Sequence, residues 1–70
     1  EREERRRAVQ HAILALPHDL RQVVVLRHFG ELSYDEIAEA VGTSAGVVKS
    51  RLHEAKRKLG KLLGDLRTTS

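Results

Sequence analysis

LSYDEIAEAVGTSAGVVKSRLHEAKRKLGK, residues 32–61, predicts a short acidic helix, a turn that contains glycine, and a longer basic helix. The acidic residues of the first helix are followed by six lysines and arginines in the second. Two helices joined in this way form a helix-turn-helix, whose second helix enters the major groove of DNA. The stretch therefore predicts DNA binding.

Capping residues set the ends of these two helices. Ser33 and Glu36 form a capping-box pattern, in which each side chain bonds the other residue's backbone N–H. Gly42 is expected to stop the first helix, and either Thr43 or Ser44 caps the second. The two helices are thus predicted over 34–41 and 44–63.

Upstream of residue 32 the pattern predicts two more helices, over 3–16 and 18–29. Pro17 separates them, because proline fits best in the first turn of a new helix. The β-branched run Val23–Val25 could form a strand, but the helical signals on both sides favour a buried helix. Gly30 is expected to end this helix in the left-handed conformation. The predicted fold is all-α, a single four-helix domain over residues 1–70 with a C-terminal helix-turn-helix and no strands.

The composition restricts the classes of function. With 70 residues and no cysteine, the chain is too small for two cores and has no thiolate metal site. Its net charge of +3 permits an anionic partner, and no apolar run approaches the length of a membrane span. The absence of methionine at the start is typical of a domain excised from a longer protein. A cytoplasmic, nucleoid-associated location is expected.

The apolar stripe of the last helix determines which side chains it offers to DNA. The stripe consists of Val48, Leu52, Ala55, Leu59 and either Leu62 or Leu63. If it faces the core, the helical period of 3.6 residues places a polar face on the other side. That face carries Ala45, Gly46, Lys49, Ser50, His53 and Arg57.

Residues near the start of a recognition helix reach base edges. Lys49 can donate to guanine O6 or N7, and Ser50 can donate or accept at several bases. His53, one turn further, can reach a base or a phosphate. Tyr34 and Thr43 stand at helix starts, where free N–H groups and hydroxyls suit phosphate. The alternative for all of these side chains is an ordinary solvated surface.

No catalytic or metal site is predicted. The serines have no base at motif spacing and no glycine-rich phosphate loop is present, so we expect no enzyme activity. The four histidines are not paired at helical metal-site spacing, and neither a cofactor nor a metal is expected.

The sequence resembles region 4 of bacterial sigma factors, most closely the extracytoplasmic-function (ECF) group, over about residues 8–63. The resemblance rests on four pieces of sequence: Leu16-Pro17 with Arg21, Val24 to Arg27, the string LSYDEIA at 32–38, and GVVKSRL at 46–52 with Ala55. It implies recognition of the −35 promoter element, docking on the β-flap of RNA polymerase, and occlusion of these surfaces by an anti-sigma factor.

Carried over to this chain, the resemblance implies base or near-base positions for Lys49, Ser50 and His53. Tyr34, Glu36 and Thr43 match positions near the DNA backbone, and Arg51 matches a basic position that serves a phosphate or a structural pair. Glu54 departs from the pattern, since relatives often have arginine there. A carboxylate at this point repels phosphate, or accepts from a cytosine amino group if it reaches one.

A docking surface for polymerase or an anti-sigma factor is a separate expectation. A short partner helix would lay its apolar face in a groove between the first two helices and the end of the last one. The residues expected to line that groove are Ile13, Val24, Phe29, Leu59, Leu62 and Leu63.

Two other functions remain open. The first is a helix-turn-helix output domain of another transcriptional regulator, which dimerisation would favour because such domains read paired half-sites. The second is a module bound chiefly by an anti-sigma factor or a polymerase subunit rather than by DNA.

Overall fold

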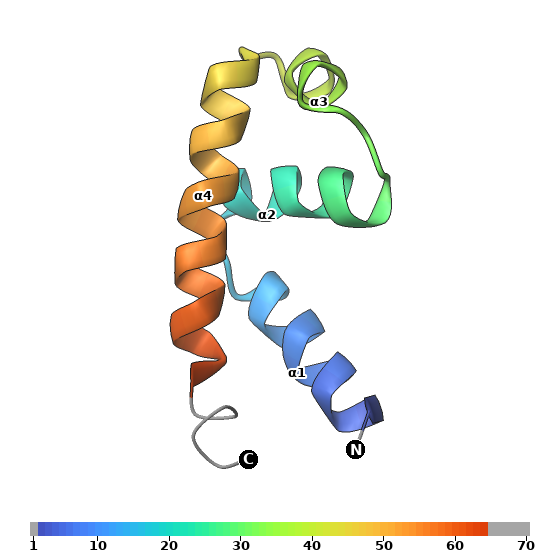
Figure 1. The fold of residues 1–70 in the computed structure, drawn as a ribbon, viewed down its shortest axis with the longest axis vertical. Helices are drawn as coiled ribbons and strands as arrows, with labels where there is room; N and C mark the ends of the chain where they lie inside the picture. Colours follow the sequence, from blue (N-terminus) through green and yellow to red (C-terminus); the bar gives the residue numbers. More distant parts are fainter. Residues whose placement is uncertain (1, 65–70) are drawn as a thin grey trace.

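The computed structural model describes residues 2–64, which form four α-helices and one π-helical turn and contain no strand. In chain order these are α1 (Arg2–Leu14), α2 (His18–Val24), η1 (Val25–Phe29), α3 (Tyr34–Val41) and α4 (Ala45–Leu62). The three shorter helices lie along one side of α4, with α3 at its start, α2 crossing its middle and α1 beside its last turns (Figure 1). The all-α prediction with a C-terminal helix-turn-helix is confirmed.

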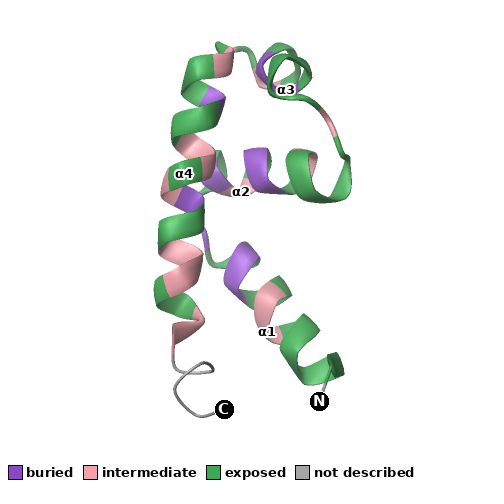
Figure 2. Cartoon of the chain, in the orientation of Figure 1, coloured by how far each residue is buried: buried purple, intermediate pink, exposed green. Residues whose placement is uncertain are grey.

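Two apolar clusters hold α4 in place, and Figure 2 shows the buried segments turned toward the inside of the fold. Leu52 packs against both clusters and joins them into one core. The first cluster, between α1, α2 and the middle of α4, consists of Ile13, Leu16, Leu20, Val24 and Ala55. The second, between α2, α3 and the start of α4, consists of Val23, Ile37, Ala38 and Val48.

The first helix ends at Leu14, two residues earlier than predicted. A residue that precedes proline is disfavoured in the helical region, so Leu16 leaves the helix and buries its side chain in the core instead. Pro17 is the residue before α2 rather than its first helical residue, and its carbonyl accepts from the N–H of Arg21 at 2.9 Å.

The run Val23–Val25 is helical, as predicted, but from Val25 to Phe29 the helix widens into a π-turn. Gly30 is not left-handed, contrary to the prediction: its φ is −86°, and the positive φ of 55° belongs to Glu31. Glycine is required at position 30 for a different reason. A Cβ there would lie 2.7 Å from the carbonyl oxygen of Leu26, because the widened turn brings the chain back over its own backbone.

The helix-turn-helix matches its predicted capping closely. The Ser33 N–H donates to Glu36 Oε1 at 2.8 Å, and the Glu36 N–H donates to Ser33 Oγ at 3.1 Å. Gly42 ends α3 with a φ of 75°, a conformation that glycine adopts without a Cβ clash. Ser44, not Thr43, caps α4, since its hydroxyl accepts from the Val47 N–H at 3.2 Å.

The capping box gives a prediction for stability against pH. The backbone N–H and hydroxyl of Ser33 lower the pKa of Glu36 below its usual value of 4.5. A lowered pKa in the folded state stabilises the fold above the usual pKa, and this contribution disappears as pH falls through the lowered value. In Glu36→Gln, urea midpoints measured between pH 6 and 2 should therefore fall less steeply with acidification than in the wild type.

Glu39→Gln is the matched control, because it removes a carboxylate from the same helix and leaves the capping box intact. Indistinguishable slopes for Glu36→Gln and the wild type would contradict a role of this carboxylate in the acid sensitivity of the fold.

Candidate nucleic-acid interface

The core seats α4 so that its polar face is exposed. Val48 and Ala55 are fully buried, whereas Lys49, Ser50 and His53 are exposed to solvent. This is the orientation that the apolar stripe predicts, because the helical period separates the two sets. The polar face at the start of α4 is therefore accessible from solvent.

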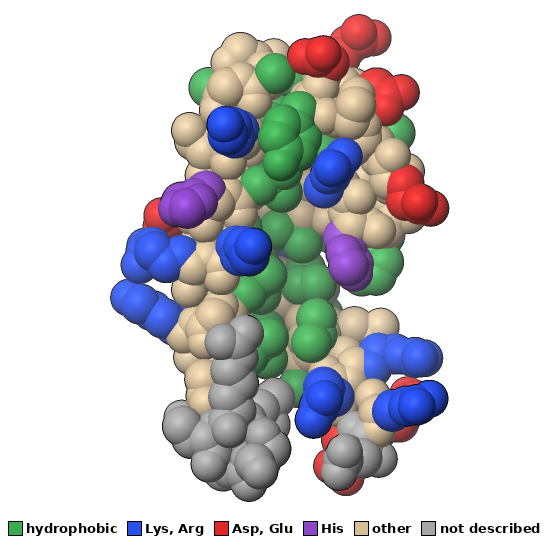
Figure 3. Space-filling view, viewed as in Figure 1, with side chains coloured by type: hydrophobic (Ala, Val, Ile, Leu, Met, Phe, Trp, Pro, Cys, Tyr) green, Lys and Arg blue, Asp and Glu red, His purple; other side chains and the backbone are tan. Residues whose placement is uncertain are grey.

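The exposed residues of α4 meet the start of α3 in a groove of about 480 Å³. Positive charge gathers here, and no acidic side chain is among the lining residues. Figure 3 shows basic side chains on both sides of a strip of apolar ones along this face of the molecule. The lining residues are Tyr34, Lys49, Ser50, Leu52, His53 and Lys56.

Two residues of this arrangement were not assigned a place by the sequence reasoning. Lys56 follows Lys49 and His53 at helical spacing, so periodicity alone was a usable signal for it. Arg27 had no such signal. Its guanidinium lies 5.0 Å from the centre of the Tyr34 ring, and its Nη1 donates to the Leu32 carbonyl at 2.9 Å. Arg27 thereby ties the loop before α3 to η1 and holds the Tyr34 ring at the edge of the groove.

The remaining predicted DNA-binding residues lie outside this groove. Arg51 is half-buried on another side of α4 from Lys49. It lies two positions further along the helix, which corresponds to about 200° of rotation. Thr43 is half-buried in the turn, where its N–H donates to the Ala38 carbonyl at 2.9 Å. Arg57 is exposed, one turn beyond His53. Their contacts with DNA stay predictions.

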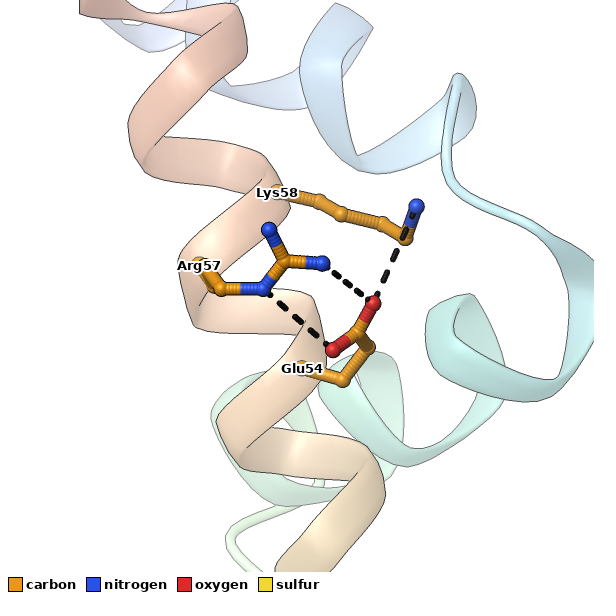
Figure 4. A network of polar contacts seen from close by, with 3 residues as sticks. All are labelled: Glu54, Arg57 and Lys58. Carbon is orange, nitrogen blue, oxygen red and sulfur yellow. Dashed lines mark hydrogen bonds and ion pairs between the residues drawn. The ribbon is translucent and has the colours of Figure 1, made fainter.

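Arg57 is already paired in the folded chain, as Figure 4 shows. Its Nη2 donates to Glu54 Oε2 at 2.7 Å and its Nε to Oε1 at 3.4 Å, while Lys58 Nζ lies 3.8 Å from Oε2. The hydrogen bond from Arg57 lowers the pKa of Glu54, and the same bond raises the pKa of Arg57. Both groups therefore stay charged at neutral pH.

Three of the six predicted docking residues line a second groove. Ile13, Val24 and Leu59 line this groove of about 430 Å³, where Ile13 and Val24 are buried and form its floor. Three residues of the first groove, Tyr34, Leu52 and Lys56, line this groove too.

Phe29 is 57% exposed and lines a smaller hollow with Leu14 and Val25, and Ile13 lines both this hollow and the second groove. Val25 and Phe29 are four positions apart and share a face, whereas Val24 faces the core. Leu62 is 51% exposed and Leu63 half-buried, and neither lines the grooves around residues 9–59 described above. A single docking surface formed by all six residues stays a prediction.

Residues 2–64 contain neither a cluster suited to a metal ion nor a helix suited to a bilayer. Within that span, no group of three histidine or acidic side chains is placed to hold a metal ion. None of the described helices is both long enough and apolar enough to cross a bilayer.

Comparison with known proteins gives a consistent result. The family described as sigma-70, region 4, matches residues 6–59. The ECF RNA polymerase sigma factor SigW of Bacillus subtilis is 43% identical over 58 residues, which cover 83% of this chain and 31% of that protein. The RNA polymerase sigma-E factor of Streptomyces avermitilis is 48% identical over 58 residues, covering 71% of this chain and 32% of that protein. The RNA polymerase sigma-H factor of Pseudomonas aeruginosa is 38% identical over 65 residues, which cover 93% of this chain and 34% of that protein. The chain spans about a third of the length of these relatives.

Proposed function

Because the chain belongs to the sigma-70 region 4 family, of the ECF type that its sequence resembles, we propose that it recognises promoter DNA through α4. In this proposal the domain reads the −35 element as part of a sigma factor bound to RNA polymerase, and has no catalytic role. It acts in the cytoplasm, at the chromosome. The observation that carries the proposal is the groove that joins Tyr34 to Lys49, Ser50 and His53 without an acidic neighbour in its lining.

The roles of the side chains follow from their positions on α4. Lys49 and Ser50 lie in its second turn, where a recognition helix approaches base edges, and Lys49 donates to guanine. Ala45 and Gly46 have small side chains in the first turn of α4, so the backbone there comes close to the DNA. His53 and Lys56, further along the groove, face the phosphates that flank the bases being read.

A second set of contacts positions the helix. The Tyr34 hydroxyl at the start of α3 and the Thr43 hydroxyl in the turn serve the DNA backbone, as does Arg51. Contacts of this kind set register and orientation but carry no sequence information. Arg57 reaches a phosphate only by leaving Glu54, since its fork of N–H groups is already engaged.

The proposal is tested by selecting duplexes from a random pool with the 70-residue chain tethered to RNA polymerase. We expect enrichment of one short motif, and Lys49→Ala should relax the preference at one of its positions. Recovery of unenriched sequence would refute promoter recognition. Enrichment of two half-sites by a dimer would instead support another type of helix-turn-helix regulator.

Binding should also fall steeply with salt. Phosphate contacts release counterions, so the logarithm of the affinity should fall with the logarithm of the salt concentration by about 0.9 per phosphate neutralised. Lys56 and Arg51, the two cations proposed to face phosphates, predict a slope of about −2, measured by fluorescence anisotropy with a labelled duplex. A flat titration would contradict DNA binding and favour a module that binds protein partners.

The second groove supports a partner site in the same domain. We propose that an amphipathic helix of the polymerase β-flap, or of an anti-sigma factor, lays its apolar side against Ile13, Val24 and Leu59. Arg27, His28 and Lys56 border this groove, so an acidic flank on the partner helix would be complementary. Mixing the chain separately with a flap fragment and with promoter DNA tests the two sites independently.

A further inference from the structure

Glu54 is the sole acidic residue of α4, in a helix that also carries six lysines and arginines. It lies four positions after Ser50, and therefore one turn beyond the residues proposed to read bases. Its side chain is 41% exposed, so the carboxylate stands at the surface beside the proposed path of the DNA. A carboxylate at that position repels the phosphates of a DNA backbone that passes beside it.

The carboxylate also engages the cations next to it. Arg57 donates to both of its oxygens, at 2.7 and 3.4 Å, and Lys58 Nζ lies 3.8 Å away (Figure 4). An arginine that forms this two-pronged contact uses the same fork of N–H groups with which it would grasp a phosphate. The pair with Glu54 and a contact with DNA through that fork are therefore alternatives for Arg57.

We propose that Glu54 is a specificity-setting residue: it holds Arg57 and Lys58 away from the DNA backbone and so limits binding that ignores sequence. Phosphate contacts contribute equally on every duplex, whereas Lys49 and Ser50 discriminate between bases. When Arg57 and Lys58 make no phosphate contacts, the binding energy that is the same on every duplex is smaller. The part of the binding energy that depends on sequence is then a larger share of the total. The inference rests on the proposed DNA-binding function.

Glu3 provides a matched control on α1. It pairs with Arg6 at 3.9 Å and Arg7 at 3.7 Å, the same spacing of three and four residues that joins Glu54 to Arg57 and Lys58. Glu3→Gln removes the same charge and releases the same number of cations, but at a distance from the interface on α4. An effect on DNA affinity that comes from net charge alone must appear in both Glu3→Gln and Glu54→Gln.

The experiment compares wild type, Glu54→Gln, Glu54→Ala and Glu3→Gln on two duplexes, one of random sequence and one selected by the wild-type chain. Circular dichroism establishes that each variant is folded. For both Glu54 variants we expect about three- to tenfold tighter binding to the random duplex at 0.1 M salt, with a salt slope steeper by about 0.9 for each cation that gains a phosphate. The ratio of selected to random affinity should fall, and Glu3→Gln should resemble wild type.

The other outcomes overturn the inference. Equal tightening in Glu54→Gln and Glu3→Gln would assign the effect to net charge. A loss confined to the selected duplex would show that Glu54 reads a base. Unchanged affinities would show that Arg57 and Lys58 do not exchange partners. A wild-type chain that enriches no duplex refutes the proposed function itself, whereas the first three results leave that function standing.

Discussion

Ile37→Ala should lower the free energy of unfolding by about 2–5 kcal/mol, the usual cost of truncating a buried isoleucine. Ile37 is fully buried between α2, α3 and the start of α4, where it packs in one cluster with Val23 and Val48. The substitution removes apolar surface and leaves a cavity that the surrounding helices fill only in part. A domain of 70 residues has a total stability of about 3–10 kcal/mol, so the loss is a large fraction of it.

The measurement is urea unfolding followed by circular dichroism at 25 °C. Leu14→Ala is the control, because it removes an aliphatic side chain that is 64% exposed and should cost no more than about 0.5 kcal/mol. Similar losses in the two variants would contradict the position of Ile37 in the core. The helix-turn-helix depends on this cluster, so Ile37→Ala should also weaken DNA binding at temperatures where the variant begins to unfold.

Lys49→Ala should weaken binding to the selected duplex by about 1–3 kcal/mol and relax the base preference at one position. The Lys49 ammonium is exposed in the second turn of α4 and lines the groove beside Tyr34. A lysine that donates to guanine O6 or N7 discriminates among bases, whereas one that meets only a phosphate does not. The measurement is the affinity of the wild type and of Lys49→Ala for a series of duplexes that differ at single positions.

Lys61→Ala is the matched control for Lys49→Ala. It removes the same charge from an exposed position of the same helix, about three turns further along. It should lower affinity equally, if at all, on every duplex. If Lys49→Ala weakens selected and random duplexes by the same factor, Lys49 contacts phosphate only, and base recognition must come from other residues.

Several features of the fold followed from local sequence because their causes are local. The capping box at Ser33 and Glu36 and the stop at Gly42 involve residues a few positions apart, so their pattern is visible without a structure. The ion pair of Glu54 with Arg57 is also local, and spacing of three residues would have suggested it. The left-handed assignment at Gly30 failed because a π-turn, which has no clear sequence signature here, moved that conformation to Glu31.

The candidate site was predicted only in part. The exposure of Lys49, Ser50 and His53 follows from the apolar stripe of α4, since one period separates the two faces. Their proximity to Tyr34 does not, because it depends on how α3 crosses α4 after the turn. The support that Arg27 gives to Tyr34 joins residues on two different elements and was likewise not predicted. The same helix packing decided that Ile13 borders two hollows, one with Val24 and Leu59 and the other with Phe29.

The sequence by itself determined that the described residues 2–64 form helices and no strand, that Ser33 and Gly42 bound α3, and which side of α4 faces solvent. These properties arise from propensity, capping and periodicity, which act within a few residues of the chain. Only the tertiary structure decided that Tyr34, Lys49 and Lys56 share one groove, that Ile13 and Val24 line another, and that Phe29 lines a smaller hollow beside Ile13. Crossing angles between helices depend on side chains that interlock across the core, and contacts so distant in the chain leave no periodic trace in it.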